Sequence, residues 1–141
     1  MLSIPPSAKV FIYSQPVDMR QAFDGLSGLV RDGMRQDSFS GHFFVFFSRC
    51  KKKIKILQWD RDGYAIWYKR LEQGNYDVSM WLADTKGNSL EVDAVHFAML
   101  LAGINFRETR KQKRFSKESL LPRLRNGGVA DRENYVSVSK A

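Results

Sequence analysis

Lysine and arginine side chains are concentrated in two segments of the sequence. Residues 49–70 hold eight of them against two aspartates, and residues 107–125 hold eight against two glutamates. Since the whole chain has a net charge of +8, the rest of it is mildly acidic. Dense cationic side chains bind polyanions by neutralising phosphates and releasing their counterions. The two segments therefore predict a nucleic-acid partner, and DNA is the partner we expect.

The predicted DNA contacts are cations of both segments. They are Arg49, Lys51, Lys52, Lys53, Lys55, Lys69, Arg70, Arg107, Arg110, Lys111, Lys113 and Arg114. A ribbon of two antiparallel strands fits the major groove, with its basic ends on phosphates. The aromatics interleaved with the first segment either stack on unpaired bases or pack as ordinary strand residues. They are Trp59, Tyr64, Trp67 and Tyr68.

Metal binding and nucleophilic catalysis have little support in the sequence. His42, His96 and Cys50 lack the spacing of zinc ligands. No glycine-rich phosphate loop or nucleophile elbow is present. We therefore predict a protein with no metal, no cofactor and no catalytic residue.

Four carboxylates give the one route to catalysis that stays open. Asp18, Asp24, Asp60 and Asp62 could form a cluster that holds metal ions for phosphoryl transfer. Asp18 is also explained as a helix N-cap, and Asp60 and Asp62 as turn residues before a glycine. A metal-dependent nuclease is therefore the less favoured hypothesis.

The elements that position these side chains predict an α+β fold with an antiparallel sheet of about four to six strands. Runs of β-branched and aromatic residues predict strands at 9–13, 42–47, 54–59, 64–70, 78–82 and 90–92. Short links between the second, third and fourth runs predict a meander, with a tight turn at 60–63. The run HFFVFF at 42–47 is apolar on both alternating sets. It is either covered on both faces or part of an oligomer interface, so a homodimer is one expectation.

Two helices are predicted to pack on the sheet. Apolar residues recur at three- and four-residue steps from Met19 to Val30, and Asp18 is the expected N-cap. A second helix is expected to begin after Asp93 as N-cap and to end before Gly103 as its C′ glycine.

The predicted elements end near residue 106, where hydrophobicity falls. We predict one α+β domain over residues 1–106 and a basic, flexible tail over 107–141. The lone cysteine and the lack of a membrane-length apolar run or signal pattern predict a cytoplasmic protein with no membrane association.

Four ordered blocks of the sequence resemble a known family. They are VDMRQAFDGLSGLV (17–30), FSGHFFVFFSR (39–49), ILQWDRDGYAIWYKRLEQG (56–74) and FAMLLAGINFR (97–107). The chain resembles the accessory protein, usually labelled TnpB, that the second open reading frame of IS-sixty-six type insertion sequences encodes. The resemblance covers about residues 9–107. Its signature positions are Asp18, Met19, Arg20, Phe23, Asp24, Gly25, Trp59, Asp60, Asp62, Gly63, Trp67 and Tyr68.

The resemblance implies a bacterial, non-catalytic helper of transposition. Such proteins are encoded beside a larger transposase, and DNA binding is often suggested for them. The implied partners are DNA, the transposase and other proteins of the same element. The alternative is a protein-interaction adaptor that docks the transposase without touching DNA, its charges serving solubility alone.

Overall fold

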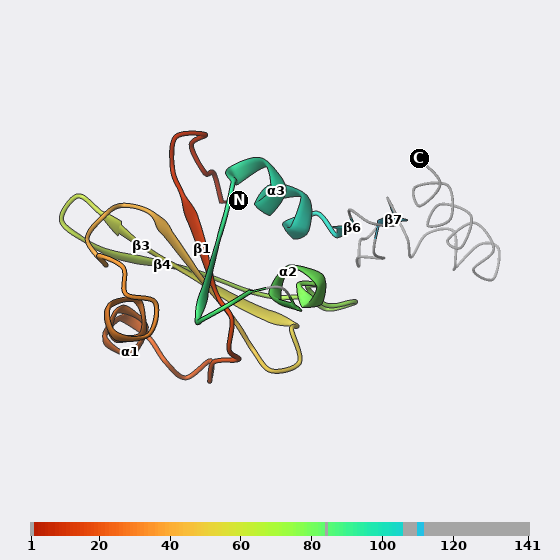
Figure 1. The fold of residues 1–141 in the computed structure, drawn as a ribbon, viewed down its shortest axis with the longest axis horizontal. Coiled ribbons are helices and arrows are strands. Elements are labelled where there is room, and N and C mark those ends of the chain that lie inside the picture. Colours follow the sequence, from red (N-terminus) through yellow and green to blue (C-terminus); the bar gives the residue numbers. More distant parts are fainter. Residues whose placement is uncertain (1, 84, 106–109, 112–141) are drawn as a thin grey trace.

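Five strands form one sheet in a computed structural model of the chain, which describes residues 2–83, 85–105 and 110–111 (Figure 1). The strands are β1 (Val10–Tyr13), β2 (Phe43–Phe47), β3 (Lys53–Asp60), β4 (Gly63–Arg70) and β5 (Ser89–Val92). Their order across the sheet is β4-β3-β2-β1-β5. The predicted α+β fold and the β2–β3–β4 meander are confirmed. One neighbour pair, β1 and β2, is parallel, and the other pairs are antiparallel.

Helical segments lie in the β1–β2 and β4–β5 connections and directly after β5. They are α1 (Phe23–Gly28), continued by a π-helical turn η1 (Leu29–Gly33), α2 (Ser79–Ala83) and α3 (Ala94–Leu101). A short ribbon of β6 (Ile104–Asn105) and β7 (Arg110–Lys111) follows α3. The α1–η1 segment lies in the β1–β2 connection and supplies the crossover that a parallel pair needs. None of the helices in the described part of the chain has the length and hydropathy of a membrane-spanning segment.

Strand β2 lies at the centre of the core. All five of its residues are buried. Alternate side chains point to opposite faces of a strand, so Val45 packs in one cluster with Phe97 of α3, and Phe44 in another with Leu26 and Val30. Both faces are thus covered within one chain, and this strand gives no reason to expect a homodimer.

The second predicted helix is confirmed together with both of its ends. The side chain of Asp93 accepts the backbone N–H of His96 at 2.7 Å, as an N-cap does. Gly103 has a φ of 82°, in the left-handed region that a C′ residue adopts.

Two local predictions were wrong. Asp18 is not an N-cap, because α1 begins only at Phe23 and Asp18 instead accepts the backbone N–H of Arg20. The run 78–82 is not a strand, since Ser79–Ala83 form α2. Short apolar runs do not distinguish a strand from a buried helical turn by periodicity alone.

Candidate nucleic-acid interface

The basic turn, residues 48–53, joins β2 to β3. Lys53 N–H donates to the Ser48 hydroxyl at 3.1 Å, and the Lys51 carbonyl accepts the N–H of Tyr76 at 2.8 Å. Lys51 has a φ of 62°, which a turn of this tightness requires. These bonds fix the backbone of the basic turn, so its side chains leave from defined positions.

The cations of the basic turn differ in their surroundings. Arg49 and Lys52 are exposed, and the Lys52 ammonium lies 3.4 Å from the Gly74 carbonyl oxygen. Lys51 and Lys53 are half-buried, and desolvation, followed by the charge of Arg49, lowers the pKa of Lys51. Within the described residues, none of these four cations is paired with a carboxylate. Their charge is therefore available to an external anion.

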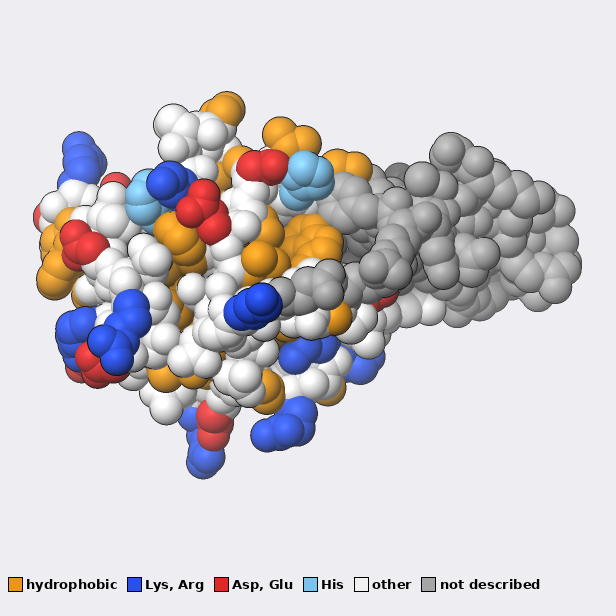
Figure 2. Space-filling view, in the orientation of Figure 1, with side chains coloured by type: hydrophobic (Ala, Val, Ile, Leu, Met, Phe, Trp, Pro, Cys, Tyr) orange, Lys and Arg blue, Asp and Glu red, His pale blue; other side chains and the backbone are white. Residues whose placement is uncertain are grey.

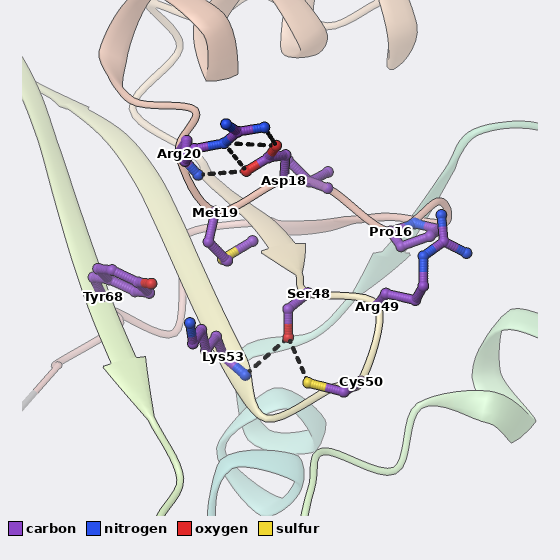
Figure 3. A pocket seen from close by; sticks show the side chains of 10 residues that line it. Pro16, Asp18, Met19, Arg20, Ser48, Arg49, Cys50, Lys53 and Tyr68 are labelled. Atoms are coloured by element: carbon purple, nitrogen blue, oxygen red, sulfur yellow. Dashed lines mark hydrogen bonds and ion pairs between the residues drawn. The ribbon is translucent and has the colours of Figure 1, made fainter.

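A pocket of about 650 Å³ opens beside the basic turn (Figure 3). Its lining comes from three places in the chain. Residues 16–20 form one side, Ser48–Cys50 the other, and Lys53 and Tyr68 come from β3 and β4. The pocket thus combines cations with the aromatic ring of Tyr68.

An ion pair occupies one side of this pocket. The Asp18 Oδ2 and Arg20 Nη2 atoms are 2.6 Å apart. Hydrogen bonds from the Arg20 guanidinium, and then from the Arg20 backbone N–H, hold the pKa of Asp18 at about 2. Asp18 is therefore ionised at neutral pH and neutralises the charge of Arg20.

Replacing Asp18 with asparagine should strengthen DNA binding about two- to fivefold, because it frees the charge of Arg20 beside the basic turn. Since the depressed pKa keeps Asp18 ionised at every pH above about 3, the gain should be the same at pH 5 and pH 8. Fluorescence anisotropy of labelled duplex DNA measures it. A gain at pH 8 that disappears at pH 5 would contradict this assignment of the charge.

Lys55 does not belong to the surface interface that the sequence predicted. It is 7% exposed, and its ammonium donates to the carbonyl oxygens of Met19 at 2.7 Å and Gln21 at 2.6 Å. It also lies 4.6 Å from the centroid of the Tyr68 ring. Lys55 therefore holds the segment after Asp18 against β3, and through it the pocket residue Met19.

Lys69 and Arg70, the two cations at the end of β4, point to opposite faces of the sheet, because successive side chains of a strand alternate. Lys69 lies beside Trp67, with its ammonium 6.0 Å from the ring centroid, whereas Arg70 pairs in register with Lys53. Arg70 is bound to Glu72 at 2.8 Å, and this pairing raises its pKa. Glu72 thus compensates the charge of Arg70, whereas Lys69 is exposed and has no carboxylate partner in the described chain.

The second basic segment is described only in small part. The backbone of Arg110 and Lys111 forms β7, and Arg107, Lys113 and Arg114 lie outside the described residues, as does most of the predicted tail. Figure 2 shows most of the visible Lys and Arg side chains on the lower half of the described surface, where Figure 1 places both α1 and the β2–β3 connection.

The four aromatic residues predicted to stack on bases lie at three different places in the structure. Trp67 packs against the core cluster of α3. Trp59 and Tyr64 form a cluster with Phe39 at the turn end of the β3–β4 hairpin, with ring centroids 4.9 Å apart for Phe39–Trp59 and 5.0 Å for Trp59–Tyr64. Of these four aromatic residues only Tyr68 lines the pocket, and it is half exposed.

The aspartates at the hairpin end have a structural explanation. Asp60 pairs with Gly63, which confirms the tight turn predicted there. Among the residues that the structure describes, no group of three or more His, Cys, Asp or Glu side chains is placed to hold a metal ion. The carboxylate cluster of the nuclease hypothesis is therefore not formed in this part of the chain.

The family model described as IS66 Orf2 like protein matches residues 8–111. The chain belongs to this family. The resemblance to TnpB seen in the sequence is thereby confirmed, and membership implies an accessory role in transposition. Four of the signature positions line the pocket: the consecutive residues Asp18, Met19 and Arg20, and Tyr68 from a distant part of the sequence.

Two curated relatives are similar to most of the chain. One is an uncharacterized protein, y4jC, of Sinorhizobium fredii (strain NBRC 101917 / NGR234), 26% identical over 104 residues, which are 74% of this chain and 86% of the relative. The other is an uncharacterized protein, y4hO, of the same strain, 26% identical over 117 residues, which are 83% of this chain and 98% of the relative. No solved structure matches the chain.

Proposed function

We propose that this IS66 Orf2-like protein is a non-catalytic accessory factor that binds DNA of its own element through the basic turn. The observation that carries the proposal is a fixed backbone presenting Arg49, Lys52 and Lys53 without carboxylate partners in the described chain. The basic residues from 107 onward supply further charge. Its contribution is to position the element ends or the transposase in the bacterial cytoplasm, while strand cleavage belongs to another protein.

A salt series on element-end duplex DNA tests this function. If about six phosphates are contacted, the logarithm of the binding constant should fall with the logarithm of salt concentration at a slope of about −5. Gel shifts or anisotropy over about 0.05–0.3 M salt measure the slope. Affinity that is independent of salt would overturn the proposal. Incubation of the same DNA with magnesium or manganese should leave it uncut.

An adaptor function is the second candidate, and the Phe39–Trp59–Tyr64 cluster favours it. Phe39 is 59% exposed, and an exposed aromatic cluster is typical of a protein contact. The partner proposed is the transposase. Co-purification that resists both nuclease treatment and charge reversal of residues 51–53 would support docking without DNA, and the two functions can coexist on opposite ends of the hairpin.

A further inference from the structure

The pocket beside the basic turn offers two kinds of surface to a ligand. Its volume of about 650 Å³ lies within the range of about 300–1,000 Å³ of pockets that hold small molecules. Pro16, Met19 and Tyr68 supply apolar and aromatic surface, whereas Arg49 and Lys53 supply positive charge. A nucleotide matches this combination, since it joins a flat aromatic base to an anionic phosphate.

Tyr68 is held in place for stacking. Tyr68 is 50% exposed, and the ammonium of the buried Lys55 lies 4.6 Å from the ring centroid. The Lys55 ammonium is itself fixed by two backbone carbonyls, so the ring rests on a rigid support. A rigid, half-exposed ring loses little conformational entropy when a base stacks on it.

The cations of the pocket, Lys53 and Arg49, lie on one side of the Tyr68 ring (Figure 3). Figure 3 shows Tyr68 at one end of the pocket and Arg49 at the other. Lys53 lines the pocket and, among the described residues, has no carboxylate partner. The Asp18–Arg20 ion pair closes the remaining side.

We propose that this pocket holds one unstacked nucleotide of single-stranded DNA, with its base on Tyr68 and Met19 and its phosphates on Arg49 and Lys53. The inference rests on the proposed DNA binding and deepens it by naming the form of DNA. In duplex DNA the bases are stacked on each other and cannot reach a side-chain ring, so duplex binding uses the cations alone.

The test compares labelled single-stranded and duplex DNA of equal length bound to wild-type, Tyr68→Ala and Tyr68→Phe proteins. Tyr68→Ala should weaken single-strand binding about five- to 150-fold, the effect of losing one base–aromatic stack. Tyr68→Phe should retain wild-type affinity because the ring remains. Duplex affinity should change less than about twofold, since no phosphate contact is altered.

Phe39→Ala is the matched control, because Phe39 is an exposed aromatic outside the pocket. It should leave single-strand affinity within about twofold of wild type, since it removes no base contact. Thermal unfolding checks that each variant is folded. Fluorescence gives an independent measurement. A 2-aminopurine base in an oligothymidylate should lose fluorescence on binding to the wild-type and Tyr68→Phe proteins. Unchanged fluorescence with these two proteins would overturn the nucleotide pocket.

The outcomes separate this inference from the function on which it rests. If Tyr68→Ala weakens single-strand and duplex binding equally, or weakens neither, the nucleotide pocket is wrong and DNA binding through the basic turn stands. If the wild-type protein binds neither form of DNA, both proposals are overturned.

Discussion

Reversing three charges of the basic turn should weaken DNA binding about 500-fold at 0.1 M salt. The variant carries Arg49→Glu, Lys52→Glu and Lys53→Glu. Each phosphate contact adds about 0.9 to the salt slope, so three contacts account for about 2.7 log units between 0.1 M and 1 M salt. The slope should therefore fall from about −5 to about −3. Anisotropy with element-end duplex DNA at several salt concentrations measures both quantities.

A matched triple variant controls for net charge. Lys9→Glu, Arg35→Glu and Arg61→Glu change exposed cations outside the basic turn and the pocket, and either variant takes the net charge from +8 to +2. General repulsion of DNA should cost the control about tenfold or less, because no placed phosphate contact is lost. An equal loss of DNA affinity in the two variants would show that the basic turn is not the interface. Unchanged DNA affinity in both would favour the adaptor function.

The parts of the fold that the sequence predicted well have strong local signals. An Asp-rich, glycine-containing turn between two β-rich runs determines the β3–β4 hairpin, and the pairing of Asp60 with Gly63 follows from it. Asp93 and Gly103 mark the ends of α3 in the same local way. Asp18 is also a residue type that caps helices, but here its side chain accepts the backbone N–H of Arg20 in a turn. An aspartate can make either bond, so the sequence alone does not distinguish a helix cap from such a turn.

The pocket was not predicted because it is made by tertiary contacts. Its residues come from the segment before α1, the basic turn and β4, and no local pattern joins them. The role of Lys55 was missed for a related reason. Between the apolar Ile54 and Ile56, a lysine in a strand is expected to face solvent. The signal that could have corrected this is Leu57, which is apolar on the same face as Lys55 and is fully buried beneath α1 and η1.

Replacing Lys55 with methionine should lower the free energy of unfolding by about 2–4 kcal/mol, although methionine has a similar length and is apolar. The change removes the ammonium that donates to both the Met19 and Gln21 carbonyls, and a hydrogen bond to a charged group contributes about 1.5–3 kcal/mol. Relief from burying the ammonium offsets part of this loss. Urea or guanidinium unfolding, followed by circular dichroism, measures the change.

Lys53→Met is the matched control, because Lys53 is also a lysine on the same face of β3, two positions earlier. It is half-buried, and its ammonium has no hydrogen-bond or ion-pair partner in the described chain, where only its backbone N–H bonds to Ser48. The free energy of unfolding of this variant should stay within about 0.5 kcal/mol of wild type, as expected for a site without a buried network.

The two variants should also differ in how they weaken DNA binding. Lys53→Met removes one phosphate contact from the pocket lining but keeps Met19 and the Tyr68 ring in place, whereas Lys55→Met releases Met19 and the support of the Tyr68 ring. Single-strand binding should therefore fall in both, but only Lys55→Met should lower it together with stability. Equal stabilities for the two variants would show that the Lys55 ammonium does not hold this segment.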